Sequence, residues 1–229
     1  MNTRTKLKPV LDFGSPDNPI TIKQWDKKYG QATSQDSNPF SITSNIDIRT
    51  SYIQRCGYSI VTKELVDALK PYCKGNVVEV ESGSGWLAAH LRQAGVKMSC
   101  YDNRSWNVYK TLTPHTAIIE GDGPANVRKA DTVIMSWPDY NTPFAKRVID
   151  SMSCGARLLY CGEDEDGWTG DKMFHYTLAK SWEENKEFGI ELKAIHKVFN
   201  SLHYIHDNWK MFTKTRATRL SKSRREDEV

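Results

Sequence analysis

The amino-acid sequence predicts an α/β fold: a mostly parallel sheet with helices on both faces and an antiparallel pair of strands at the C-terminal edge. From residue 61 onward, short apolar runs alternate with segments of helical periodicity, which is typical of a parallel sheet. Glycine and acidic residues follow the first runs, at the strand ends where such sheets bind ligands. The last two runs have no helix between them, which favours an antiparallel pair.

The predicted elements begin with a helix over residues 61–72, where apolar side chains recur every three or four positions. Thr62 is a residue type that caps helix starts, and Pro71 is one that ends helices. A β-branched run then predicts a buried strand over 76–80. The segment 86–94 is predicted as a helix because a glycine follows its last apolar residue.

The remaining elements continue this alternation of strand and helix. They are strands over 96–101, 116–119, 131–136 and 156–161, helices over 144–153 and 171–187, and two final strands over 190–199 and 204–213.

The chain has 229 residues, of which 38% are hydrophobic and 26% are charged, a composition typical of globular proteins. Residues 1–48 are polar and lack periodicity, so they are predicted as a loosely structured extension whose aromatic residues pack on the domain or cover a site. The main domain is predicted over 49–214, followed by a basic and then acidic tail over 215–229. The apolar runs are too short to cross a bilayer, so we expect no membrane partner.

The cysteines predict the compartment. There are five of them, an odd number, and none shows Cys-x-x-Cys spacing, which disfavours a disulfide framework or a zinc site. The first residues carry no apolar segment typical of a secretory signal. We therefore expect a cytoplasmic protein with free thiols and no bound metal.

Two glycines, Gly83 and Gly85, lie between the strand over 76–80 and the helix that follows it. Backbone without a side chain can approach a ligand closely at such a turn, although a tight turn without a ligand is the alternative. Asp102 follows the next strand, where a carboxylate can accept hydrogen bonds from a ribose diol. Together the three residues predict a site for a nucleoside-containing cofactor.

The order and spacing of these residues resemble those of the class I S-adenosylmethionine-dependent methyltransferases, over residues 51–214. The segments that carry the resemblance are Glu79-x-Glu81-x-Gly83-x-Gly85, Asp102, Gly121-Asp122, 131–140 and 207–212. The resemblance implies a Rossmann-like fold and S-adenosylmethionine as the cofactor. A nicotinamide-binding domain is disfavoured, because an antiparallel last pair does not belong to it and its glycines serve a pyrophosphate at a helix N-terminus.

The resemblance also implies roles for individual residues. Glu79 would support the methionine end of the cofactor, and Gly83 and Gly85 would let it lie against the backbone. Asp102 would bind the ribose hydroxyls, and Asp122 would lie near the adenine ring.

Glu81 departs from the family's acidic-x-Gly-x-Gly-x-Gly pattern, because it stands where the first glycine is expected. Its carboxylate would turn away from the cofactor, pair with the cofactor's amino group or sulfonium, or obstruct binding. Two functions therefore stay open. One is an S-adenosylmethionine-dependent methyltransferase acting on a nucleic acid, a protein or a small molecule. The other is a catalytically degenerate relative that serves as a nucleic-acid or protein interaction module.

The segment Ser136–Tyr140 resembles the (Asp/Asn/Ser)-Pro-Pro-(Tyr/Phe/Trp) motif of amino-group methyltransferases, with Trp137 in its polar position and Asp139 in place of the second proline. Trp137 and Tyr140 are predicted either as an aromatic wall for a planar or cationic substrate or as core residues. Glu163, at the end of the fifth strand, is predicted to orient a substrate or to take a proton.

Basic residues crowd the stretch Lys210–Arg225. They predict either a contact with the phosphates of a nucleic acid or a solvated terminus without a partner.

Overall fold

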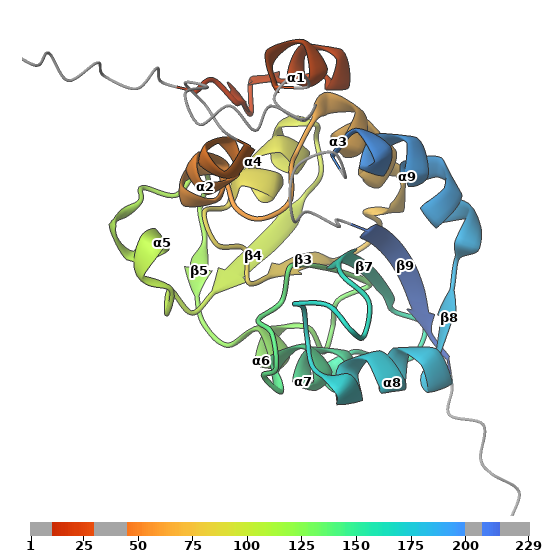
Figure 1. The fold of residues 1–229 in the computed structure, drawn as a ribbon. Helices are drawn as coiled ribbons and strands as arrows, with labels where there is room; N and C mark the ends of the chain where they lie inside the picture. Colours follow the sequence, from red (N-terminus) through yellow and green to blue (C-terminus); the bar gives the residue numbers. More distant parts are fainter. Residues whose placement is uncertain (1–10, 30–44, 200–207, 216–229) are drawn as a thin grey trace, which may run out of the picture.

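The computed structural model describes residues 11–29, 45–199 and 208–215. A seven-stranded sheet with the order β5-β4-β3-β6-β7-β9-β8 forms its centre (Figure 1). Its strands are β3 (Val77–Val80), β4 (Met98–Asp102), β5 (Ile119–Glu120), β6 (Thr132–Ser136), β7 (Arg157–Gly162), β8 (Trp182–Glu184) and β9 (Asn208–Lys214).

Strands β3 to β7 pair in parallel, and β9 is antiparallel to both of its neighbours, β7 and β8. From β3 the chain passes to β4 and β5 on one side and then to β6 and β7 on the other. The strand order therefore reverses between β3 and β6, which is where open α/β sheets form their ligand crevice. The predicted mostly parallel, Rossmann-like sheet with an antiparallel C-terminal edge is confirmed.

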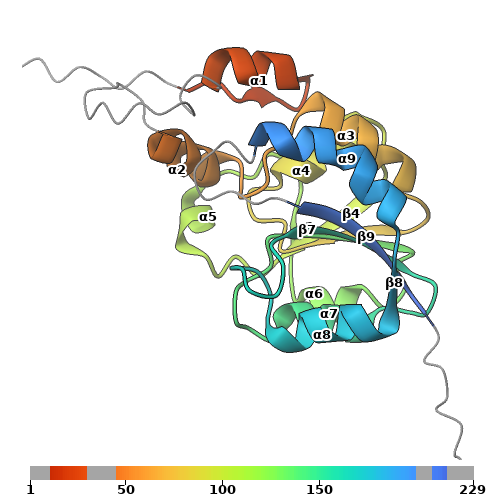
Figure 2. The same ribbon diagram turned by 45° about the vertical axis from the view of Figure 1, so that its right-hand side comes forward.

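Helices cover both faces of the sheet (Figure 2). One face carries α3 (Lys63–Leu69), α4 (Trp86–Gln93) and α9 (Lys186–Phe199); the other carries α6 (Gly123–Asn126), α7 (Phe144–Ser151) and α8 (Lys172–Ser181). The helix α5 (Asn107–Thr111) lies beyond the end of β4.

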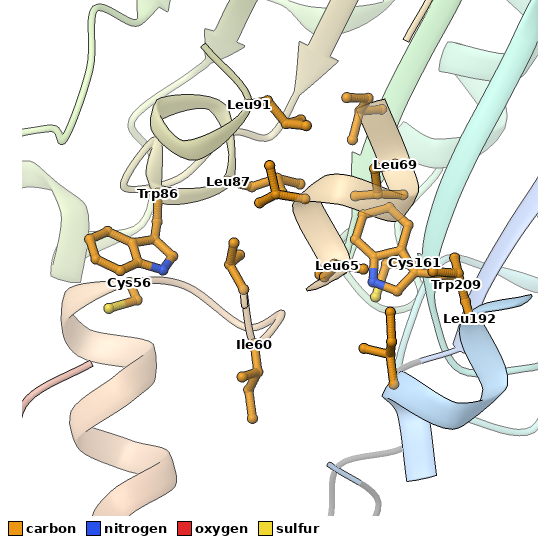
Figure 3. Close-up of a cluster of buried hydrophobic side chains, with 14 of the residues drawn as sticks. Cys56, Ile60, Leu65, Leu69, Trp86, Leu87, Leu91, Cys161, Leu192 and Trp209 are labelled. Carbon is orange, nitrogen blue, oxygen red and sulfur yellow. The ribbon is translucent and has the colours of Figure 1, made fainter. Parts of the chain in front are cut away.

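The central strands are buried on both faces, because their alternate side chains enter two separate apolar clusters. In β6, Val133 and Met135 pack toward α7, while Ile134 packs toward α3 and α4. Figure 3 shows part of the larger cluster, to which Ile134 belongs. In it, leucines of three helices meet Trp209 of β9. Burial of this kind is the main stabilising contribution to a fold of this size.

Residues 11–29 form a short hairpin, β1 (Gly14–Ser15) with β2 (Asn18–Pro19), and then α1 (Ile22–Tyr29). Phe13 and Trp25 are buried against Tyr52 of α2 (Asn45–Arg55), with ring centroids 5.0 and 5.6 Å away. The Lys63 amide also donates to the Ile20 carbonyl at 2.9 Å. This part of the predicted extension therefore packs on the domain, whereas Phe40 lies outside the described residues.

Two sequence predictions near the C-terminus are wrong. The helix predicted over 171–187 ends at Ser181 and gives way to β8, and the strand predicted over 190–199 is part of helix α9. The reason lies in side-chain burial. Phe188, Leu192 and Ile195 recur at helical spacing and are buried, while Ile190 is 71% exposed. A strand would have placed Ile190 and Leu192 on the same face.

This difference gives a test of helix α9. Replacing Leu192, which is fully buried, with alanine should cost about 2–5 kcal/mol of unfolding free energy. The matched change Ile190→Ala should cost less than about 0.5 kcal/mol, because that side chain is mostly exposed. Chemical denaturation of both variants measures the two values, and similar losses would indicate a strand.

Candidate functional site

A cavity of about 350 Å³ opens at the carboxyl ends of the parallel strands. Its walls come from the segment before α3 and from the loops that follow β3, β4, β6 and β7. This volume lies within the range of small-molecule sites. Six of the predicted site residues line it: Glu79, Glu81, Gly83, Asp102, Trp137 and Tyr140.

The loop after β3 is fastened to the end of β4. One carboxylate oxygen of Asp102 accepts a hydrogen bond from the Gly83 amide at 2.8 Å, and the other accepts one from the Arg104 amide at 2.6 Å. Gly83 has a φ of +55°, and a Cβ there would lie 2.8 Å from the Tyr109 ring. Glycine is thus required by the backbone conformation and by a protein side chain, and Asp102 holds the loop in place.

Glu81 adopts a φ of +51°, in the left-handed region that glycine enters freely and other residues enter at a cost. The backbone therefore has the conformation of a glycine at the position where the family pattern has one. A glutamate in this conformation also carries its carboxyl group into the wall of the cavity. The departure from the pattern is thus a change of side chain on a backbone that suits glycine.

Two carboxyl groups of this wall are buried without full hydrogen bonding. One oxygen of Glu79 and one of Glu81 have no hydrogen-bond partner among the described residues. Burial raises the pKa of Glu79 to about 8, against the lowering effects of Ser82 and Arg92. Burial also raises the pKa of Glu81 well above its usual range, and the negative charge of Asp139 adds to it.

These groups suit a cationic or proton-donating ligand. Two further acids, Asp102 and Asp139, line the same cavity, and no Lys, Arg or His is among its described lining residues. A buried carboxyl group without a partner is costly, and a positively charged ligand would remove that cost. This set of carboxyl groups therefore fits a ligand that carries an ammonium or sulfonium group.

A stack of three aromatic rings forms a second wall. Tyr58 lies between Trp106 and Trp137, with centroid distances of 5.2 and 5.4 Å and interplanar angles of 22° and 19°. The guanidinium carbon of Arg49 lies 5.6 Å from the Tyr58 centroid and 5.7 Å from that of Trp137. Trp137 packs against the larger of the two apolar clusters while it lines the cavity.

The mouth of the cavity carries a further aromatic pair. The Tyr140 and Trp168 rings lie 5.3 Å apart, and the side chains are 53% and 72% exposed. They come from the loops that follow the neighbouring strands β6 and β7. Exposed aromatic rings at the rim of a cavity are available to a ligand.

Three predicted site residues, Gly85, Asp122 and Glu163, do not line the cavity. Gly85, with a φ of +73°, packs against Thr116 and Ile118. Asp122 accepts a hydrogen bond from Arg147 at 2.8 Å on the surface. Their predicted roles beside a cofactor stay predictions.

Glu163 is buried and faces its own loop. Its carboxylate accepts a hydrogen bond from the Trp168 amide at 2.6 Å, and its own amide donates to the Thr169 hydroxyl at 2.9 Å. Glu163 therefore holds the loop that carries Trp168. Its predicted role toward a substrate stays a prediction.

Only the first part of the basic stretch lies in the described residues. Lys210 forms an ion pair with Asp164. The Lys214 ammonium donates to the carbonyls of Ile149, Asp150 and Met152 at 2.7 to 3.0 Å. These two cations are engaged within the fold, and residues 216–229 lie outside the described ranges.

Within those ranges, no helix is both long and apolar enough to cross a bilayer. The same residues contain no cluster of three or more His, Cys, Asp or Glu side chains suited to a metal ion.

Sequence reasoning missed several residues of the cavity wall: Tyr58, Trp106, Tyr109, Asp139 and Trp168. For Trp106 and Trp168 a signal existed, because each lies in a loop that follows a parallel strand. Tyr58 carried no such signal, since it precedes the first predicted helix.

No protein-family model matches the chain, and no curated protein sequence matches it. Among solved structures, it is similar to the plantazolicin methyltransferase BpumL in complex with SAH (12% identity over 85% of this chain and 98% of that chain, TM-score 0.42). It is also similar to TehB from Haemophilus influenzae (14% identity, 73% and 67% covered, TM-score 0.43). A third is human N-acetylserotonin methyltransferase in complex with SAM (12% identity, 88% and 72% covered, TM-score 0.40).

A pair of glycine variants separates backbone strain from crowding at the loop after β3. Gly95→Ala should cost about 1–2 kcal/mol of unfolding free energy, because its φ of +93° is unfavourable for alanine while the space around it is open. Gly83→Ala should cost more, since its Cβ would also meet Tyr109. Denaturation measures both, and equal costs would show that Tyr109 gives way freely.

The buried Glu79 gives a test by pH. The folded protein holds this proton more tightly than the unfolded chain does, so stability should fall as pH rises from about 4.5 towards about 8. Each unit by which the pKa is raised corresponds to about 1.4 kcal/mol. Glu79→Gln should flatten this fall in denaturation experiments across that window. The control Glu120→Gln, at an exposed carboxyl group, should retain it.

Proposed function

We propose that this chain is an S-adenosylmethionine-dependent methyltransferase whose cofactor site is the cavity at the ends of β3 and β4. The observation that carries the proposal is the pair of buried carboxyl groups, Glu79 and Glu81, in a cavity at the reversal of the strand order. S-adenosylmethionine carries an ammonium, a sulfonium and a carboxylate group, so its net positive charge matches this wall. When bound, it supplies a methyl group that an acceptor can attack.

Individual residues have distinct roles in this proposal. Asp102 holds the Gly83 loop and offers its remaining lone pairs to the ribose hydroxyls. Glu79 offers its unpaired oxygen to the ammonium group, and Glu81 offers its own to the sulfonium charge, from which the methyl group leaves for the acceptor. The loop Ser136–Tyr140 and Trp168 form the side toward the acceptor. The main contribution of such a site to rate is to hold the two reactants together and in line.

One observation favours the alternative of a degenerate, non-catalytic relative. The Glu81 side chain occupies part of the cavity wall where the family pattern has a glycine without a side chain. If the side chain obstructs the cofactor, the chain would act as an interaction module for a nucleic acid or a protein. Cofactor binding decides between the two functions.

Isothermal titration calorimetry with S-adenosylmethionine should show binding, and Asp102→Asn should weaken it about 10- to 150-fold. This range corresponds to about 1.5–3 kcal/mol for hydrogen bonds that involve a charged group. The control Asp67→Asn, at an exposed residue of α3, should bind as the parent does. Absence of binding by the folded parent would favour the interaction module.

Replacing Glu81 with glycine tests its role directly. If the carboxylate pairs with the cofactor's cationic groups, Glu81→Gly should weaken binding of S-adenosylmethionine more than binding of its uncharged-sulfur product. We expect this result, because one oxygen of Glu81 has no hydrogen-bond partner in the part of the chain that the structure describes. Tighter binding of both compounds would instead show that the side chain obstructs the site.

A further inference from the structure

We propose that the outer half of the cavity binds a small organic amine in its ammonium form, and that this amine becomes the methyl acceptor once its nitrogen has given a proton to the Glu81 carboxylate. The nitrogen would attack the methyl carbon with the lone pair so freed, and the electron pair of the broken carbon–sulfur bond would stay on the sulfur of the cofactor. The inference rests on the proposed function and names the substrate class of the same site. It is carried by the position of aromatic rings and carboxyl groups on adjoining loops.

Acidic side chains line the outer wall of the cavity. Glu81 and Asp139 both line the cavity and lie close together, because the backbone amide of Asp139 donates a hydrogen bond to the Glu81 carboxyl group. They come from the loops after β3 and β6, which are neighbouring strands. One oxygen of Glu81 is buried and has no hydrogen-bond partner within residues 11–29, 45–199 and 208–215. A ligand that brings a positive charge or N–H donors to this point would supply what the fold leaves out.

Exposed aromatic rings form the rim of the cavity. Tyr140 follows Asp139 directly in the sequence, so a ring and a carboxylate lie on the same loop, and Trp168 packs against that ring. Arg49 already lies near the rings of Tyr58 and Trp137. Within the described residues, no Lys or Arg lies over the rings of Trp106, Tyr140 or Trp168. These rings remain available to a cation from outside.

The lining of the cavity disfavours other classes of acceptor. An anionic acceptor would meet four carboxyl groups and no lining cation in the described residues. The phosphates of a nucleic acid would be repelled by the same groups. A neutral planar molecule could use the rings but would leave the Glu81 oxygen unpaired. An ammonium group attached to an apolar body satisfies both the rings and the carboxyl groups.

Binding of such a cation should be linked to a proton. The charged groups that act on Glu81 are Asp139 and Asp102, both of which are acids. A bound ammonium favours the ionised carboxylate, so Glu81 would release its proton to solvent as the amine binds. The affinity for the amine should therefore rise with pH while the amine itself remains protonated.

The test uses 2-phenylethylamine, its neutral analogue 2-phenylethanol and its anionic analogue 3-phenylpropionate, titrated calorimetrically into the full chain. Each titration is run with and without saturating S-adenosylhomocysteine, which fills the cofactor end. We expect the amine to bind at least about tenfold more tightly than the alcohol, and the acid to bind most weakly. Equal affinities for the amine and the alcohol would overturn the proposal.

Three variants locate the effect. Glu81→Gln should reduce the amine's advantage to less than about threefold and remove its pH dependence, while leaving the alcohol's affinity unchanged. Tyr140→Ala, at an exposed ring, should weaken the amine more than the alcohol, because the amine loses a cation–π contact as well as an apolar one, and it keeps the test valid if Glu81→Gln fails to fold. Glu165→Gln makes the same charge change at an exposed residue outside the cavity wall, and it should change nothing. An equal loss in Glu165→Gln would reduce the effect to net charge and refute the site.

The two proposals fail separately. Binding of S-adenosylmethionine without discrimination among the three probes would refute the amine site and leave the methyltransferase standing. Discrimination among the probes without binding of S-adenosylmethionine would refute the methyltransferase and leave a site for organic cations.

Discussion

The carboxyl end of β3 is the constraint on which the site depends. This strand pairs in parallel with β4 on one side and β6 on the other, and its residues are buried on both faces. The chain must leave such a strand abruptly to reach α4, and it does so through a loop that Asp102 fastens to β4. The reversal of strand order at the same place leaves room above the sheet. The cavity thus follows from how a buried parallel strand ends.

Around this point the strand ends and loops bring carboxyl groups and aromatic rings to one cavity. The end of β3 and the loops after β3 and β4 contribute three carboxyl groups, the backbone of Gly83 and the ring of Trp106. The loops after β6 and β7 contribute the rings of Trp137, Tyr140 and Trp168 and the carboxyl group of Asp139. The loop after β7 is held in place, because the Glu163 carboxylate accepts a hydrogen bond from the Trp168 amide. A rigid sheet therefore positions two sets of groups that lie far apart in the sequence.

The sequence predicted the fold well where pattern and burial agree. The strands over 76–80 and 131–136 were predictable because each is a short run of mostly apolar, β-branched residues that is buried on both faces. The segment after residue 187 was not, because Ile190 and Leu192 match the period of a strand while Phe188 and Leu192 match that of a helix. Only the packing of α9 against β9 decides between the two periods.

The candidate site shows the same limit. Ligands of parallel sheets lie beyond the strand ends, and this rule predicted a shared site for Glu81, Asp102 and Trp137. The three residues do line one cavity. Tyr58 could not be predicted, because it precedes the first predicted helix and its position in the cavity wall depends on tertiary packing against Trp106 and Trp137. Glu81 combines a positive φ with an unpaired buried oxygen, and each is a cost that a glycine would avoid. Such paired costs are characteristic of functional positions, and a cation bound at the carboxyl group would offset the second.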